Sequence, residues 1–120
     1  MSYRIVRAVI KRVGQKPEIV EIKPGHEELQ GVVGGDIESV LAFNAPGTRF
    51  SIIGYANKEG RIRALPFNFH RMIDREPIAG NVVFVGDIAG DQVGLALETA
   101  SQLVELITKH SPATDQDLPS

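Results

Sequence analysis

The sequence predicts a single α+β domain, in which an antiparallel or mixed sheet of five to six strands is packed by a C-terminal helix and one short helix. Three observations predict it. The 120 residues are 42% hydrophobic and 23% charged, a composition that suits one soluble domain. Runs rich in Ile and Val are separated by Gly, Pro and Asn clusters, which are typical of turns between strands. Near the C-terminus, apolar residues recur at helical spacing.

The N-terminal part predicts a β-hairpin followed by a short helix. Residues 3–13 form an Ile- and Val-rich run with basic residues between them, and the turn signal of residues 14–17 joins this run to residues 18–23. Residues 26–33 then place apolar side chains at helical spacing. We expect Gly34-Gly35 to cap this helix, although paired glycines also permit the close approach of a ligand.

The middle of the chain predicts a second group of strands. Residues 36–43 and 50–56 read as strands, and residues 44–47 form the loop between them. Residues 57–60 have the polar, glycine-ended composition of a hairpin turn. We therefore expect residues 61–65 to return as a strand antiparallel to residues 50–56.

Pro66 should end that pairing, after which the chain turns onto the surface. Residues 78–85 are the most strand-like run and predict a central strand buried on both faces. A C-terminal helix should start between residues 91 and 98, with an apolar face of Val93, Ala96, Leu97, Ala100, Leu103, Val104 and Ile107. The polar, Pro-containing residues 111–120 predict a disordered tail, which leaves residues 1–110 as the domain.

Composition excludes several classes of function. The chain has no cysteine, which rules out disulfides, thiolate nucleophiles and cysteine-containing metal sites. No segment approaches the ~20 apolar residues of a membrane span, and residues 1–4 do not begin a signal peptide. We expect a cytoplasmic protein with no membrane partner.

The net charge of -2 hides four blocks of opposite sign. Residues 1–16 and 46–86 are net basic, whereas residues 17–45 and 87–120 are net acidic. Separate positive and negative surface regions are compatible with anion binding or self-association, and the small total argues against general nucleic-acid binding. The alternative is that the blocks are solvated faces paired across neighbouring strands.

Tests for catalysis and metal binding are negative at the sequence level. The histidines His26, His70 and His110 are far apart and lack the spacing of metal ligands. The serines lie in no nucleophile motif, and no lysine stands in an evidently desolvated context. Residues 85–91 link a strand to a helix but lack the lysine and glycine spacing of a phosphate loop. We expect no cofactor, no metal and no enzymatic activity.

One segment combines the groups that bind a nucleotide. Residues 61–71 interleave arginines, which pair with phosphate, with aromatic rings and an amide, which stack on or hydrogen-bond a base. The candidate ligand-binding residues are Arg49, Arg61, Arg63, Asn68, Phe69, His70 and Arg71. The alternative interpretation is that the phenylalanines are core residues and the arginines form a solvated face.

Several short motifs occur in a distinctive order, namely Lys16-Pro17-Glu18, Val33-Gly34-Gly35, Asn57-Lys58-Glu59-Gly60, Leu65-Pro66-Phe67-Asn68 and Ile78-Ala79-Gly80. In order and spacing they resemble domain-of-unknown-function family 3846, over about residues 7–105. The resemblance implies a phage or plasmid setting and no particular reaction. Family members commonly carry arginine directly after the asparagine, where this chain has Phe69, with Arg71 two positions further on.

These observations together lead to one functional hypothesis and two alternatives. The first is a non-enzymatic, phage-type counter-defence protein in the host cytoplasm that sequesters an anionic nucleotide signal as a cyclic nucleotide sponge. We expect it to be a homo-oligomer with sites near subunit boundaries. The second is an inhibitor or adaptor that engages a host protein through a sheet edge or Gly34-Gly35. The third is a small nucleotide-modifying enzyme.

Overall fold

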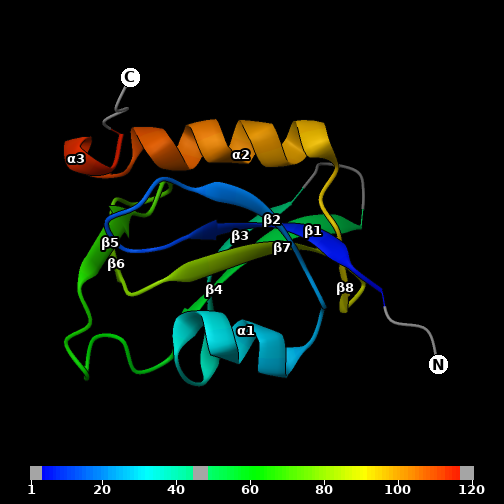
Figure 1. Cartoon of the computed structure of the whole chain (residues 1–120), viewed down its shortest axis with the longest axis horizontal. Coiled ribbons are helices and arrows are strands. Elements are labelled where there is room, and N and C mark those ends of the chain that lie inside the picture. The colour runs from blue at the N-terminus through cyan, green and yellow to red at the C-terminus, as the bar shows by residue number, and fades with distance from the viewer. Residues whose placement is uncertain (1–3, 45–48, 117–120) are drawn as a thin grey trace.

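A six-stranded antiparallel sheet with a helix on each face forms the framework of the computed structural model, which describes residues 4–44 and 49–116 (Figure 1). The strand order is β2-β1-β7-β4-β3, and β8 also pairs with β7. The strands are β1 (Val6–Lys11), β2 (Glu18–Ile22), β3 (Ile37–Asn44), β4 (Phe50–Asn57), β7 (Val82–Ile88) and β8 (Asp91–Val93). The predicted α+β class, the sheet and the N-terminal hairpin are confirmed.

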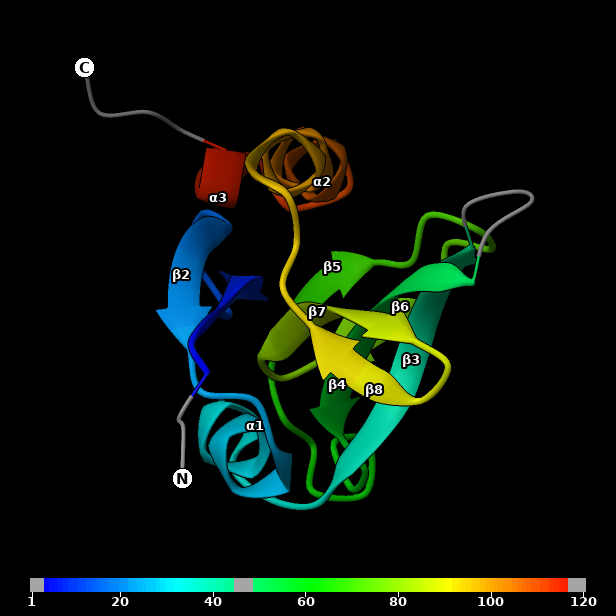
Figure 2. The ribbon, with the colours of Figure 1, turned by 90° about the vertical axis from the view of Figure 1, so that its right-hand side faces the viewer.

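The two helices make separate cores on the two faces of the sheet. Helix α2 (Leu97–Lys109) covers one face and α1 (His26–Val33) the other, as Figure 2 shows from the side. Side chains of β7 alternate between these cores: Val82 and Phe84 pack in the core that contains α2 residues, and Val83 and Val85 pack in the core that contains α1 residues. All four are fully buried, so the central strand is buried on both faces as predicted.

A small second sheet lies beside the first and consists of β5 (Phe67–His70) and β6 (Pro77–Ala79). The predicted strand of residues 78–85 is therefore divided into β6 and β7. The break falls at Gly80, which has a φ of 81°, a left-handed conformation that suits glycine. The predicted surface path after Pro66 is wrong, because residues 67–70 pair with β6.

The Gly34-Gly35 pair ends α1 in the way that the capping interpretation predicts. Gly34 has a φ of 81°, and its N–H donates to the carbonyl of Gln30 over 2.8 Å. A Cβ at Gly35 would lie 2.9 Å from Nδ2 of Asn57, so this position packs directly against the end of β4. Both glycines thus have a structural use.

The predicted strand over residues 61–65 is wrong. Residues 58–64 form consecutive turns, in which Arg63 N–H donates to Glu59 O over 2.8 Å. The hydrogen-bonding edges of β4 are already taken by β3 on one side and β7 on the other. A returning strand would have no edge to pair with, so the chain leaves the sheet at Asn57.

Helix α2 starts at Leu97, within the predicted interval, but its buried face is narrower than predicted. Ala100, Leu103 and Ile107 are buried, whereas Leu97 is 57% exposed. Val93 belongs to β8 instead, where it pairs with Gly86 of β7. Because Val93 pairs with a central strand, it does not belong to the apolar face of the helix, although its spacing in the sequence fits that face.

The predicted disordered tail needs correction for residues 111–116. This segment turns at the end of α2 and forms the one-turn helix α3 (Ala113–Gln116). Asp115 is only 6% exposed and contacts the interior, which fixes a segment that composition alone assigns to disorder. The rest of the predicted tail lies outside the described residues. Of the predicted loop at residues 44–47, Asn44 is instead the last residue of β3, and residues 45–47 also lie outside the described residues.

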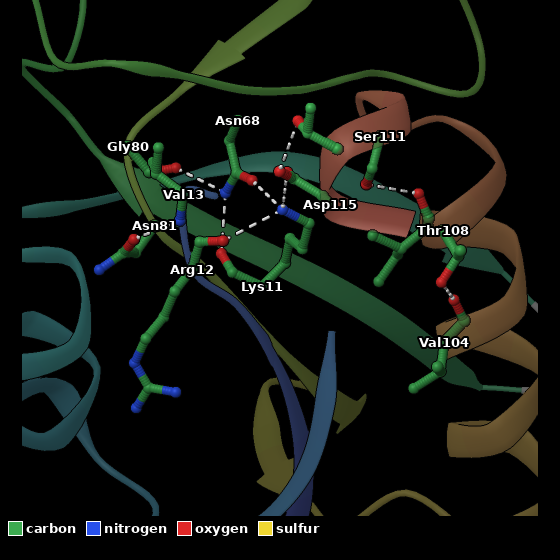
Figure 3. Close-up of polar contacts among 12 residues, drawn as sticks. Lys11, Arg12, Val13, Asn68, Gly80, Asn81, Val104, Thr108, Ser111 and Asp115 are labelled. Atoms are coloured by element: carbon green, nitrogen blue, oxygen red, sulfur yellow. Dashed lines mark hydrogen bonds and ion pairs between the residues drawn. The ribbon is translucent and has the colours of Figure 1, made fainter. Parts of the chain in front are cut away.

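The partner of Asp115 is a fully buried lysine. Nζ of Lys11 donates to Asp115 Oδ2 over 2.9 Å, to Asn68 Oδ1 over 2.8 Å and to Arg12 O over 3.0 Å (Figure 3). Nδ2 of Asn68 donates to the carbonyls of Lys11 and Gly80, each over 2.8 Å. Every donor of both side-chain groups is satisfied, which is the condition for burying them. The expectation that no lysine is desolvated is therefore wrong.

Replacing Asp115 by alanine should destabilise the protein strongly, because it leaves the Lys11 ammonium buried without its counter-charge. We expect a loss of about 3–5 kcal/mol in the free energy of unfolding, measured by urea denaturation. Adding Lys11→Met to the variant should recover part of the loss. A loss below about 1 kcal/mol, as for an exposed ion pair, would contradict the buried pairing.

Candidate functional site

A cleft of about 470 Å³ opens where β3 and the end of β4 meet the turns of residues 58–64 and strand β6. The chain's exit from the sheet at Asn57 creates one wall of it. Charged side chains of both signs line the cleft: Glu38, Lys58, Arg61, Arg71 and Glu76. It is the candidate functional site, because it gathers cations from separate segments around one concave surface.

Arg71 is the most firmly held cation of the cleft. The register between β3 and β4 shifts between Ser39 and Leu41, which leaves Val40 as the extra residue of a β-bulge. The carbonyl of Val40 accepts a hydrogen bond from Arg71 Nη1 over 3.3 Å. Nε and Nη2 of the guanidinium group donate hydrogen bonds to the two carboxylate oxygens of Asp74. The bulge and Asp74 together fix the planar fork of Arg71 beside the cleft.

This pairing shifts the acid–base behaviour of both partners. The hydrogen bond from Arg71 is the main cause that lowers the pKa of Asp74 from 3.8 to about 2, and the backbone N–H of Glu76 contributes. The same hydrogen bond raises the pKa of Arg71. Both groups therefore stay charged at neutral pH.

Arg61 is held more loosely. Its Nη2 lies 3.6 Å from Glu76 Oε2, and the two side chains are 77% and 54% exposed. Such an exposed pair contributes little to stability and can rearrange when a ligand arrives. At the base of the turns, Asn57 Oδ1 accepts the N–H of Glu59 over 2.8 Å, which fixes where they begin.

The structure brings together two of the seven candidate residues, Arg61 and Arg71. Arg63 is exposed and points elsewhere, with Nη1 3.5 Å from the carbonyl of Gly34. Arg49 is exposed just before β4, an eight-residue strand. It lies about 25 Å from the cleft end of that strand at a rise of ~3.4 Å per residue. Arg49 would lie near Arg61 or Arg63 only if residues 61–65 returned as a strand beside residues 50–56, and that hairpin does not form.

Asn68 and Phe69 are interior residues. The pairing of β5 with β6 is irregular between Phe67 and Phe69, so both residues are buried although they are consecutive. The ring of Phe69 packs 6.3 Å from that of Phe84, centroid to centroid. The alternative interpretation of the phenylalanines as core residues is therefore confirmed for Phe69 and wrong for Phe67, which is 41% exposed.

His70 lies outside the cleft as well. Its ring is 4.7 Å from that of Phe67, and it lines a separate hollow with Arg75, Lys109 and His110. The basic segment of residues 61–71 thus divides among the cleft, the interior and a second surface, because the turns and β5 point its side chains in different directions.

The N-terminal basic block does not reach the cleft. Arg4 Nη2 donates to Gln92 O over 2.6 Å, Arg7 Nη1 donates to Leu95 O over 3.1 Å, and Arg12 pairs with Glu18. These arginines fasten β1 to the segment before α2 and to β2.

Sequence reasoning missed three charged residues of the cleft: Glu38, Lys58 and Glu76. Lys58 belongs to the motif of residues 57–60, whose composition indicated a turn. Nothing in that motif indicated that the turn borders a cleft. Within residues 4–44 and 49–116, no three His, Asp or Glu side chains gather in a way that could hold a metal ion. In the same ranges, no helix is long and apolar enough to cross a membrane.

By its fold and its site, the protein is a small α+β domain with a charged surface cleft. The chain belongs to the domain of unknown function family DUF3846, whose sequence profile matches residues 6–108. This match confirms the family resemblance drawn from the motifs. Comparison with curated proteins and with solved structures found no match.

The Asp74–Arg71 pair makes a direct pH prediction. Carboxyl-carbon NMR should give a titration midpoint for Asp74 near 2, and Arg71→Gln should move it up toward 3.8. Because the pKa is lowered by folding, the stabilisation from this pair is present above the unfolded value and is lost as the pH falls through about 2. A midpoint that Arg71→Gln leaves unchanged would contradict the pairing.

Proposed function

We propose that the protein binds a small anionic nucleotide in the cleft and sequesters it without changing it. The observation that carries this proposal is the convergence of Lys58, Arg61 and Arg71 on one cleft. Arginine forks and lysine ammonium groups are the usual partners of phosphate oxygens. Arg71 supplies a guanidinium charge that Asp74 and the carbonyl of Val40 hold in place, whereas Arg61 can leave Glu76 to meet the ligand.

A nucleotide suits the cleft better than a bare phosphate does. The volume of about 470 Å³ is within the range of small-molecule sites. Glu38 and Glu76 would repel a free anion, but their oxygens can accept hydrogen bonds from ribose hydroxyls or base N–H groups. Ile62, which also lines the cleft and is 85% exposed, supplies an apolar surface for a base. Phosphate, sugar and base would each meet a complementary group.

Sequestration is the role that we propose for this binding. In the mobile-element setting that the family resemblance implied, the ligand would be a nucleotide immune signal, such as a cyclic nucleotide, and the protein would lower its free concentration. The proposal includes a homo-oligomer in the cytoplasm. Light scattering during size-exclusion chromatography measures the oligomeric state separately from binding.

Isothermal titration against a panel of cyclic and linear nucleotides tests the proposal. We expect a measurable dissociation constant for at least one of them, with about tenfold or greater weakening in Arg61→Gln and in Arg71→Gln, since each removes charged hydrogen bonds of about 1.5–3 kcal/mol. Arg49→Gln is the matched control, because it removes an exposed arginine outside the cleft. Circular dichroism checks that the variants fold.

Two results would contradict the proposal. One is the absence of heat with every nucleotide at near-millimolar concentration. The other is an equal loss of affinity in Arg49→Gln, which would indicate attraction by diffuse charge. Chromatography of the recovered ligand should show intact nucleotide. An altered nucleotide would contradict sequestration and favour the alternative of a nucleotide-modifying enzyme.

A further inference from the structure

An amine, an amide and a carboxyl group meet in the interior, away from the cleft. Lys11 and Asn68 are fully buried and Asp115 is 6% exposed. They come from β1, β5 and α3, and Figure 3 shows their side chains pointing toward one another. Transamidation, in which an amine displaces ammonia from an amide, requires three groups: a nucleophile, an amide carbonyl carbon and a residue that transfers protons.

The amine is close to the amide carbon. Nζ of Lys11 lies 2.8 Å from Oδ1 of Asn68. Since a C=O bond is about 1.23 Å long, the Cγ atom is no more than about 4 Å from Nζ. The Asn68 amide is also fixed in orientation, because its Nδ2 donates to the carbonyls of Lys11 and Gly80. The limit on the distance between Nζ and Cγ is close to the ~3–3.5 Å distance of a near-attack geometry.

Asp115 can make the amine nucleophilic. An ammonium group has no lone pair, so Lys11 must first lose a proton. Asp115 Oδ2 already accepts a hydrogen bond from Nζ over 2.9 Å and is placed to take that proton.

We propose that the protein joins Lys11 to Asn68 by an intramolecular amide bond, formed without another enzyme. After the proton passes to Asp115, Nζ attacks Cγ of Asn68 and the Nζ–Cγ bond forms. The Cγ–Nδ2 bond then breaks, and Nδ2 leaves as ammonia with the second proton released by Nζ. The products are a secondary amide, one ammonia molecule and a neutral Asp115. No oxidant, reductant or co-reactant is needed.

Two consequences would favour the product. It replaces a buried ion pair by neutral groups, which removes the cost of keeping two charges out of water. It also links β1 to β5 across a sequence separation of 57 residues. Such a link restricts the unfolded chain far more than the folded one, and it should raise the melting temperature.

Intact-protein mass spectrometry of the full chain tests the proposal. The expected mass is lower than that of the sequence by one ammonia molecule. Digestion should then yield one branched peptide that joins the segments around Lys11 and Asn68. A mass equal to that of the sequence would overturn the proposal.

Variants distinguish the Lys11–Asn68 amide bond from other reactions that release ammonia. Lys11→Arg keeps a buried cation but cannot form the bond, so it should have the mass of its own sequence. A deficit that persists in Lys11→Arg would point to cyclisation of an asparagine and would overturn the proposal. Asp115→Asn should also have the full mass of its sequence. Asp91→Asn, which changes an exposed carboxylate, should still be lighter than its sequence by one ammonia molecule. A deficit retained in Asp115→Asn would overturn the proton-carrying role.

Discussion

The buried ammonium group of Lys11 is the interaction on which the packing of this end of the molecule depends. It hydrogen-bonds to Asn68 of β5 and pairs with Asp115 of α3, so one cation ties together three elements that are distant in the sequence. An isolated buried charge would cost several kcal/mol, and only the complete set of partners offsets that cost. The small sheet and α3 are therefore held to β1 through contacts that the buried ammonium group of Lys11 requires.

The saturation of the central strands explains the position of the cleft. Both edges of β4 are paired, which forces the chain out of the sheet after Asn57 and into the turns that wall the cleft. Elsewhere in the lining of the cleft, the bulge at Val40 presents a carbonyl that orients Arg71. Two departures from regular strand pairing thus place cations that come from different segments around the same hollow.

Local patterns predicted the parts of the fold that depend on neighbours in the sequence. The hairpin, α1 with its glycine cap, the buried β7 and the start of α2 follow from periodicity and turn chemistry. The candidate site was predicted only in part, since Arg61 and Arg71 lie in the cleft and Asn68 and Phe69 lie in the interior. Long-range pairing decides these outcomes: the pairing of both edges of β4, the partner of β5 and the buried contact of Asp115 cannot be read from local composition.

The separation of 104 residues between Lys11 and Asp115 also bears on how the protein is made. During synthesis β1 emerges first, whereas the carboxylate that neutralises its lysine emerges after every strand of the sheet. A nascent chain can collapse its apolar strands, but it cannot close around Lys11 until α3 has left the ribosome. A product of premature termination before residue 115 would carry an unneutralised cation where the interior should be, and the proteases that remove incomplete chains could distinguish it from the finished protein.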